Sequence, residues 1–382
     1  MSLSIGAGFN VGAGFSISVA PTAVAGATST VSGNPNTAIT SFSPFSSVTG
    51  GIAPYTYYVS SGTLPTGITI NSSTGLVSGT PTVLQSAANV VFSVRDAANS
   101  VATTTSTVSF SVIVATFTLE YLVVAGGGAG GQSGGTYGQS GGGGAGGLVR
   151  GQISITPGTA FTFSIGSGGA SLSGQGGTGN PSALSSPVIT TITAIGGGGG
   201  GSGGPGIYSG APGGSGGGGN PFGPGTQPSQ NPGNPTIIQQ YGSNGGNANG
   251  NSDGAGGGGA GGAGVVSPGP GPGALTSGGA GYTWPVTGLT YAGGGPNNPV
   301  PWSAPGASPG SAGTAGRGNG GQAGSGGFNS GGVGGAGGSG TVILTVPTPN
   351  YPGSAPGASV TTPPAAPGKT VLTYTSSGSY TA

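Results

Sequence analysis

The side chains that carry most enzyme chemistry are nearly absent from this sequence. Among its 382 residues there is no His and no Cys, and the carboxylates are Asp96, Glu120 and Asp253. A serine or cysteine nucleophile activated by histidine therefore cannot be assembled. A glycoside hydrolase needs two carboxyl groups about 5–9.5 Å apart, and these three stand on different segments. The inventory predicts that the protein is not an enzyme.

The sequence also offers few residues or motifs that could bind a metal or a cofactor. Zinc sites use His and Cys ligands, and a calcium site made only of carbonyl oxygens would be weak. Gly-x-Gly-x-x-Gly strings are frequent, but none opens a helix after a strand, and no Gly-Lys-Ser/Thr motif follows one. We expect neither a metal nor a cofactor.

The scarcity of charge limits the possible partners. Four basic and three acidic side chains give a formal net charge of +1, which offers no footprint for nucleic acid or an anionic membrane. No window approaches the ~18 consecutive apolar residues of a membrane-spanning helix. The first residues also lack the basic and then apolar pattern of a signal peptide. We expect a protein made in a cytoplasm, without membrane insertion.

Glycine dominates the composition, with 97 residues, most of them in runs between Gly126 and Gly340. Glycine loses more backbone freedom on folding than alanine, by roughly 0.5–1 kcal/mol. Such a region is either a disordered linker or gains a packing that only glycine permits. Strand-like pieces recur inside it, and glycine lacks the strict period of collagen. We therefore predict extended polyglycine II helices, packed closely enough to exchange N–H···O=C bonds.

Residues 5–19 alternate strictly between apolar residues and small or polar ones. This period of two predicts a strand or hairpin. It is either an edge strand of the next domain or an assembly strand whose glycine face lets another backbone approach closely. In the second interpretation residues 1–19 mediate assembly into a homo-oligomer through Ile5, Phe9, Val11 and Phe15.

Residues 20–115 contain short runs rich in Val, Ile, Phe and Thr with turn signals between them, which predicts a β-sandwich. Four motifs occur in order, at residues 54–57, 62–68, 73–81 and 91–96. With them, roughly residues 35–115 resemble the Ig-like repeat of bacterial and phage surface proteins. The resemblance implies a spacer or a weak binding module. Related cadherin-like domains bind calcium through clustered acidic residues, whereas Asp96 stands alone.

The glycine-rich region is bracketed by the apolar segments 117–125 and 341–346, which we expect to lie side by side. Pro157 and Gly158 predict a turn between strands at 151–156 and 159–165, and residues 182–184 and 188–195 predict a second hairpin. Together with the motifs at 121–128, 141–150, 291–295 and 337–344, these segments make residues 117–346 resemble the glycine-rich domain of phage tail fibres. The resemblance implies polyglycine II packing and, in some relatives, a receptor-binding tip.

The predicted fold class is all-β plus polyglycine II. An Ig-like β-sandwich is followed by packed polyglycine II helices on a small β base. Residues 348–382 form a Pro-rich linker and a C-terminal strand or hairpin. That strand resembles the one that usually precedes Tyr-Leu-Val-Val in such domains, displaced to the end of the chain. It either returns to its own sheet or adds to the sheet of a neighbouring subunit.

Large side chains of the glycine-rich domain are concentrated in Pro- and Asn-rich interruptions. Aromatic residues held on a rigid scaffold offer apolar area at low rotamer entropy, which suits recognition of sugars or proteins. The alternative is that they plug the ends of the glycine bundle as a small core. The candidate receptor-binding residues are Tyr208, Phe222, Tyr241, Tyr282, Trp284 and Trp302.

These expectations combine into a virion structural protein, located on the particle and extracellular after release. It would be a phage fibre or tail-tip adhesin that binds a host cell-surface glycan or outer-membrane protein, with weak contacts multiplied by the copies on the particle. Its other partners would be further virion proteins, with no nucleic acid among them. The alternative is a purely structural capsid decoration, neck appendage or self-assembling extracellular surface filament.

Overall fold

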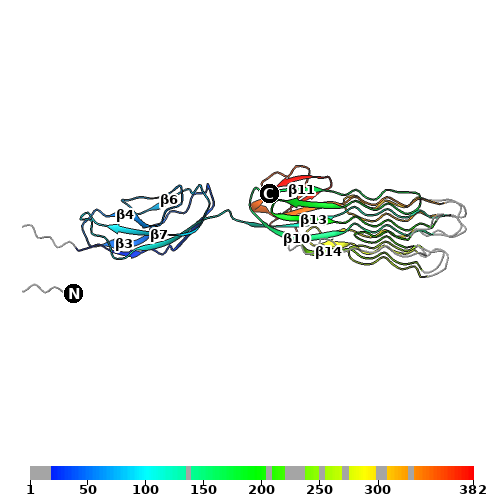
Figure 1. Ribbon diagram of the computed structural model, residues 1–382, viewed down its shortest axis with the longest axis horizontal. Coiled ribbons are helices and arrows are strands. Elements are labelled where there is room, and N and C mark those ends of the chain that lie inside the picture. Colours follow the sequence, from blue (N-terminus) through cyan, green and yellow to red (C-terminus); the bar gives the residue numbers. More distant parts are fainter. Residues whose placement is uncertain are drawn as a thin grey trace, which may run out of the picture. The chain divides into compact units, whose positions relative to one another are not determined.

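The computed structural model describes residues 19–134, 139–203, 209–219, 237–248, 254–268, 275–297, 308–325 and 331–382. The chain divides into two compact units, Met1–Ala115 and Thr116–Ala382 (Figure 1). Each has its own hydrophobic core. Within these described ranges no helix has the length and apolar character needed to cross a membrane. The predicted assembly residues Ile5, Phe9, Val11 and Phe15 lie outside the described residues.

The first unit is the predicted Ig-like β-sandwich. Its largest sheet has the order β2-β8-β7-β4, in which only β2 and β8 run parallel. Two further pairs are β1 with β3 and β5 with β6. Phe92 and Phe110 lie at the centre of the core, with ring centroids 6.4 Å apart. The strands are β1 (Thr22–Ala25), β2 (Thr30–Gly33), β3 (Phe45–Thr49), β4 (Thr56–Ser61), β5 (Ile68–Ile70), β6 (Val77–Gly79), β7 (Gln85–Arg95) and β8 (Ser106–Val112).

The second unit is built on a β base of two antiparallel sheets. The large sheet has the order β14-β10-β9-β17-β19-β18, and the small sheet has the order β13-β12-β11-β20. The large sheet consists of β9 (Phe117–Val124), β10 (Leu148–Ile155), β14 (Ile237–Tyr241), β17 (Thr341–Pro347), β18 (Ser359–Thr361) and β19 (Lys369–Tyr374). The small sheet consists of β11 (Ala160–Ser164), β12 (Ser182–Ser186), β13 (Ile189–Ala194) and β20 (Gly378–Thr381).

Alternation along β9 explains how the two sheets pack. Phe117, Leu119, Tyr121 and Val123 are buried on one face, where they form a core with the small sheet. The intervening residues of β9 face the other side of the large sheet. There a separate hairpin, β15 (Tyr282–Trp284) and β16 (Leu289–Tyr291), covers the end of the sheet that adjoins the glycine segments. The large sheet is therefore covered on both faces at that end.

Several predicted strand positions are confirmed. β17 pairs with β9, and β12 forms a hairpin with β13. The predicted turn at Pro157 and Gly158 is present, but it does not join two paired strands, because β10 belongs to the large sheet and β11 to the small one. The C-terminal residues return to their own unit: β19 pairs with β17, and β20 pairs with β11.

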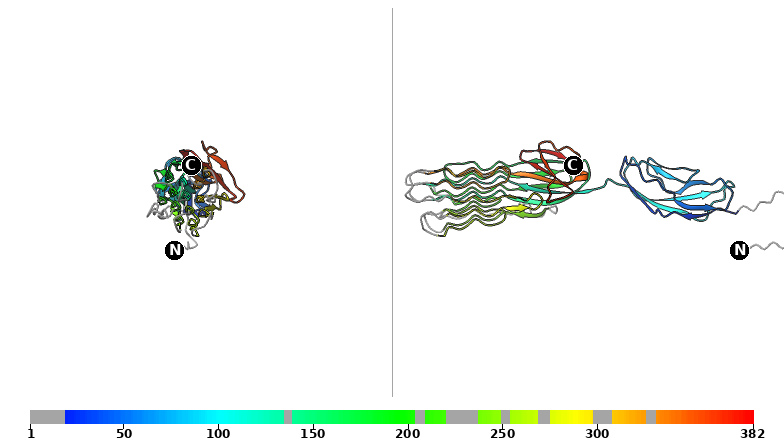
Figure 2. Two further views of the ribbon diagram at one scale, coloured as in Figure 1. Left: turned by 90° about the vertical axis from the view of Figure 1, so that its right-hand side faces the viewer. Right: turned by 180° about the vertical axis from the view of Figure 1, so that it is seen from behind.

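The predicted packed polyglycine II helices are not seen. Within the described residues the only helical segment is one 3₁₀ turn, η2 (Thr348–Asn350). The glycine runs are instead extended segments outside any helix or strand, which run side by side away from the base strands (Figure 2). We call these segments the glycine bundle. They comprise residues 125–134, 139–147, 165–181, 195–203, 209–219, 242–248, 254–268, 275–281, 292–297, 308–325 and 331–340.

Backbone hydrogen bonds join the separate segments of the glycine bundle to one another. The amides of Gly127, Gly128 and Ala129 donate to the carbonyls of Gly338, Gly144 and Gly177, at 2.9, 2.8 and 2.8 Å. Three successive residues thus bond to three different segments, so that these bonds link neighbouring segments and do not form the turns of an α- or 3₁₀-helix. The lattice satisfies the buried backbone polar groups without regular secondary structure.

Candidate functional site

Three of the six predicted receptor-binding residues lie together in the second unit. Tyr241 ends β14, and Tyr282 and Trp284 belong to β15. All three contact the face of the large sheet that points away from the small sheet. Tyr208, Phe222 and Trp302 lie outside the described residues.

These three residues and Tyr291 form an aromatic cluster that is mostly core. Trp284 is 3% exposed and packs with Leu122, Leu148 and Ile343 of the large sheet. The rings of Tyr241 and Tyr282 are 4.4 Å apart between centroids. Burial first, and then a hydrogen bond with Tyr282, raises the pKa of Tyr241, with Arg150 acting in the opposite direction. For Trp284 this burial favours the core alternative over direct receptor contact. Receptor contact by the aromatic cluster as a whole stays a prediction.

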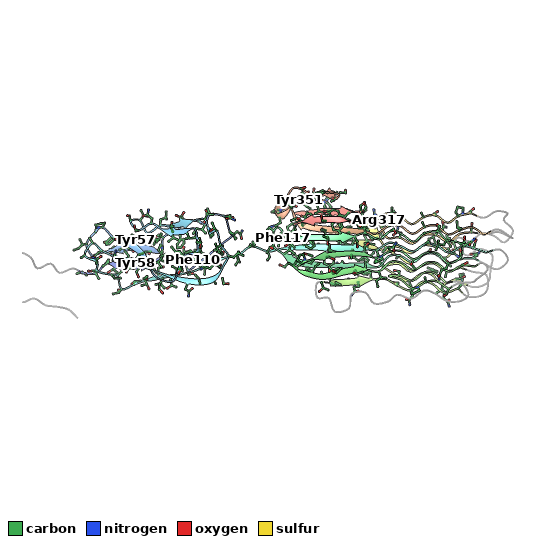
Figure 3. All side chains as sticks on the ribbon, turned by 45° about the horizontal axis from the view of Figure 1, so that its top comes forward. Tyr57, Tyr58, Phe110, Phe117, Arg317 and Tyr351 are labelled. Atoms are coloured by element: carbon green, nitrogen blue, oxygen red, sulfur yellow. The ribbon has the colours of Figure 1, made fainter. Side chains whose placement is uncertain are left out.

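Two arginines each contact one ring of the aromatic cluster. The Arg150 guanidinium lies 5.7 Å from the Tyr282 ring centroid, and the Arg317 guanidinium lies 5.0 Å from that of Tyr291. Arg317 also donates to the Thr290 carbonyl at 3.0 Å, at the junction of the base strands and the glycine bundle (Figure 3). Cation–π contacts of this kind contribute about 0.5–1 kcal/mol at exposed sites.

Charged side chains gather on the same face of the large sheet, although charged residues make up only 2% of the chain. Lys369 Nζ lies 2.7 Å from Glu120 Oε1, with the two side chains 38% and 32% exposed. Arg150 Nη2 donates to Gln239 Oε1 at 3.0 Å. Glu120 pairs across the strands with Gln152, so that these polar side chains line one side of the aromatic cluster.

A small cleft separates these polar side chains from the hairpin of β15 and β16. Its volume is about 170 Å³. The sheet lines it with the polar side chains of Glu120, Arg150 and Gln152, and the hairpin lines it with Trp284, Pro285 and Val286. Tyr121, Gly151 and Ile238 of the sheet complete the lining. The sequence showed each charged residue but not their convergence, because the register that places Glu120 opposite Gln152 is set by strand pairing. The alternation within residues 117–124 was the one available signal, since it put Glu120 on the face opposite Tyr121.

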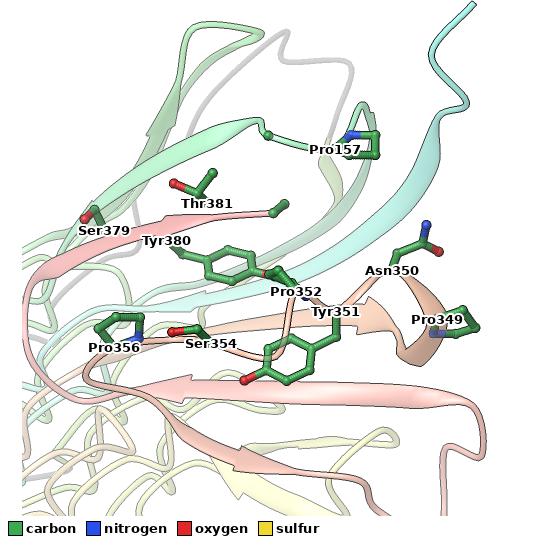
Figure 4. A pocket seen from close by; sticks show the side chains of 12 residues that line it. Pro157, Pro349, Asn350, Tyr351, Pro352, Ser354, Pro356, Ser379, Tyr380 and Thr381 are labelled. Carbon is green, nitrogen blue, oxygen red and sulfur yellow. The ribbon is translucent and has the colours of Figure 1, made fainter. Parts of the chain in front are cut away.

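A larger cavity of about 690 Å³ lies beside β20, with Tyr380 and Tyr351 on its wall (Figure 4). Prolines before and after Tyr351 and Pro157 of the turn after β10 complete much of the lining. Burial, followed by proximity to Tyr374 and Tyr351, raises the pKa of Tyr380 to about 12. The polar side chains of the lining are neutral, and they include Asn350, Ser354 and Thr381.

Asp96 in the first unit is buried at 2% exposure, and both of its carboxylate oxygens accept backbone amides. Its Oδ1 accepts the amides of Ala98 and Ser100 at 3.0 and 2.8 Å, and its Oδ2 accepts the amide of Ile52 at 3.1 Å. Because all three partners are donors, the carboxylate fixes loops. In the part of the chain that the structure describes, no group of three or more acidic residues could hold a metal ion.

The fold is that of an all-β protein in which an Ig-like sandwich precedes a glycine-rich unit. The sequence matches the family model described as "Glycine-rich domain" over residues 103–347. This match covers more than half of the chain, and the protein belongs to that glycine-rich domain family. A second model, described as "Putative Ig domain", matches residues 17–115. No curated protein matches the sequence significantly. The two matches confirm both predicted domain types and are compatible with a structural or adhesin protein.

Proposed function

We propose that this chain is a fibre or tail-tip adhesin of a phage particle, which acts by binding a host surface and not by catalysis. The combination of an Ig-like unit with a glycine-rich domain supports the proposal, since each resembles modules of phage and bacterial surface proteins. On the particle the chain contacts other virion proteins and copies of itself. Many copies multiply weak individual contacts into firm adsorption.

The observation that carries the proposal is the hydrogen-bond lattice of the glycine bundle. Because successive amides bond to different neighbours, each segment is held by several others. A scaffold of this kind keeps the described segments in fixed positions relative to one another. A scaffold that is already ordered loses less conformational entropy when it binds a ligand. Because backbone hydrogen bonds hold such a scaffold together, it needs few charged side chains, in agreement with the composition.

The test uses the full chain and intact particles. Antibodies against the chain, detected with gold in the electron microscope, should mark the end of a fibre or tail. The labelled chain should also bind host cells and compete with particles for adsorption. A Gly262→Ala variant should compete equally well, since an added methyl group there has no neighbour closer than 3.8 Å. Unmarked particles, or marked particles together with unlabelled cells, would contradict the adhesin function.

A purely structural role is the second candidate, and one observation favours it. Trp284 and Tyr291 are 3% and 2% exposed, so these large side chains serve the fold more than a surface. Under this proposal the chain is a capsid decoration, neck appendage or self-assembling extracellular filament. Particles would then carry the chain at sites away from the adsorbing end, and cells would stay unlabelled.

A further inference from the structure

We propose that the cleft between the large sheet and the hairpin of β15 and β16 binds a single pyranose ring of a neutral saccharide. Glu120, Arg150 and Gln152 would bond its hydroxyl groups, and Pro285 and Val286, which are more exposed than Trp284, would contact its apolar face. The inference rests on the proposed adhesin function, because it names the class of host ligand.

The dimensions of the cleft select a small ligand. At about 170 Å³ it is smaller than the roughly 300–1,000 Å³ pockets that enclose drug-sized ligands. One sugar ring fits this scale, whereas a folded peptide segment does not. The rest of a longer glycan would extend over the exposed side of the large sheet, where Gln152 and Ser154 are exposed.

The charges of the cleft favour a neutral ligand. Glu120 is held by Lys369 at 2.7 Å through Oε1, which leaves Oε2 as an acceptor for hydroxyl protons. The carboxylate of Glu120 and the guanidinium of Arg150 carry opposite charges, so the lining presents no single sign of charge to an anionic or a cationic ligand. A sugar diol both donates and accepts, and therefore matches a wall that carries a carboxylate, a guanidinium and an amide.

The opposite wall complements the other surface of a sugar. The C–H face of a pyranose is apolar, and the side chains of Trp284, Pro285 and Val286 present apolar surface to the cleft. The ligand would thus meet polar groups on one side and apolar groups on the other. This is the general composition of small-molecule sites, in which a few polar groups fix the orientation of a ligand held by apolar contacts.

The polar wall is ordered before any ligand arrives. Arg150 is fixed by Gln239 at 3.0 Å and by the Tyr282 ring, and Tyr241 Oη donates to the same Gln239 oxygen at 2.6 Å. The hairpin strands are also bridged by the hydroxyls of Thr283 and Thr290, 2.8 Å apart. Little side-chain freedom remains to be lost when a sugar binds.

Sugar titrations of the full chain test the inference. In a Trp302→Phe variant, Trp284 is the remaining one of the two tryptophans, so fluorescence reports on the cleft. Neutral pyranoses should produce a saturable change with a Kd of about 1 mM, as expected for one ring with few contacts. Uronic acids and inorganic phosphate serve as charged probes and should bind at least about tenfold more weakly.

Substitutions then assign the signal to the cleft. Glu120→Gln and Gln152→Ala should each weaken sugar binding by up to about tenfold. The loss is smaller where water replaces the missing hydrogen bond. Lys369→Met is the matched control, because it breaks the ion pair with Glu120 but keeps the carboxylate, and its affinity should stay within about twofold. Thermal melting of each variant verifies the fold.

The outcomes separate the sugar site from the adhesin function. Saturable binding of neutral sugars that is weakened in Glu120→Gln and Gln152→Ala, but not in Lys369→Met, supports the site, even if host cells remain unlabelled and the adhesin function fails. The inference is overturned if no neutral sugar binds, if charged probes bind better, or if both variants bind sugar unchanged. Cell labelling that persists in those cases leaves the adhesin function standing with another ligand site.

Discussion

Gly143 lies where other backbones approach it closely. Its amide donates to Gly321 at 2.8 Å, and its carbonyl accepts the amide of Gly295 at 2.8 Å. A methyl group on its Cα would meet the Gly128 carbonyl oxygen closer than real contacts permit. The obstacle is backbone held in its own hydrogen bonds, and such atoms cannot rotate away as a flexible side chain would.

Gly143→Ala should therefore destabilise the second unit. Overpacking of this kind typically costs about 1–3 kcal/mol, and the hydrogen-bonded surroundings place the effect at the upper end. Chemical denaturation followed by circular dichroism measures it. Gly262→Ala is the matched control in the same bundle, because its nearest neighbour is 3.8 Å away, and it should change the unfolding free energy by less than about 0.5 kcal/mol. Equal losses in the two variants would contradict the packing argument.

In the first unit, Asp96 is a single residue whose replacement should destabilise the fold. Asp96→Ala leaves three amides without their acceptor, and this should lower the unfolding free energy by about 3 kcal/mol. Asn71→Ala removes a side-chain oxygen that accepts two amides at 3.0 Å in an exposed turn, where water replaces it at a cost below about 1 kcal/mol. A chelator should leave the melting temperature of the wild-type chain unchanged, whereas a calcium-dependent melting temperature would refute the role given to Asp96.

At the scale of elements, the two sheets of the base meet through tyrosines with buried hydroxyls. Tyr374 of β19 and Tyr380 of β20 are 1% and 2% exposed. Neither hydroxyl has a hydrogen-bond partner within the described residues. Burial is the main reason that the pKa of each is raised from 10.0 to about 12. The folded unit therefore keeps two protons that the unfolded chain releases at lower pH.

This difference predicts a loss of stability in alkali. The contribution of each tyrosine is fully present below pH 10 and is lost as the pH rises towards about 12, because the unfolded state binds fewer protons in that window. Tyr380→Phe removes one of these groups, so the alkaline unfolding midpoint should rise. At pH 7 its stability should be nearly unchanged, since the lost hydroxyl had no partner. Circular dichroism and absorbance at increasing pH measure both, and a midpoint that falls would contradict the explanation.

The sequence predicted the type of these elements better than their pairing. The apolar segments that bracket the glycine-rich region predicted that β9 and β17 lie side by side, because an apolar strand is visible in its own residues. Pairing between sheets is decided by partners far away in the chain. Pro157 and Gly158 thus separate strands of different sheets, and the cleft residues Glu120 and Arg150 come together only through the register of β9 and β10. The hydrogen bonds between the glycine runs were expected, whereas the runs themselves are extended segments and not the predicted helices.

At the scale of the whole molecule, the two units have separate cores. Calorimetry should therefore resolve two unfolding transitions. Asp96→Ala should lower one of them and Gly143→Ala the other, with additive effects in the double variant because the sites share no partner. A single transition that shifts with both variants would show that the units unfold together, contrary to this prediction.

Assembly is the remaining prediction at this scale, and it depends on residues 1–19. Their apolar and glycine alternation gives one face for packing and one for close backbone approach. If they join copies of the chain, deletion of residues 1–19 should convert an oligomer into a monomer in light scattering coupled to size exclusion. Replacing Phe9 and Phe15 by Ser should have the same effect, whereas exchanging Ser16 for Thr should not, because that change leaves the apolar face intact. An oligomer that survives the deletion would assign assembly to another surface, and a wild-type monomer at micromolar concentration would remove the assembly role of this segment.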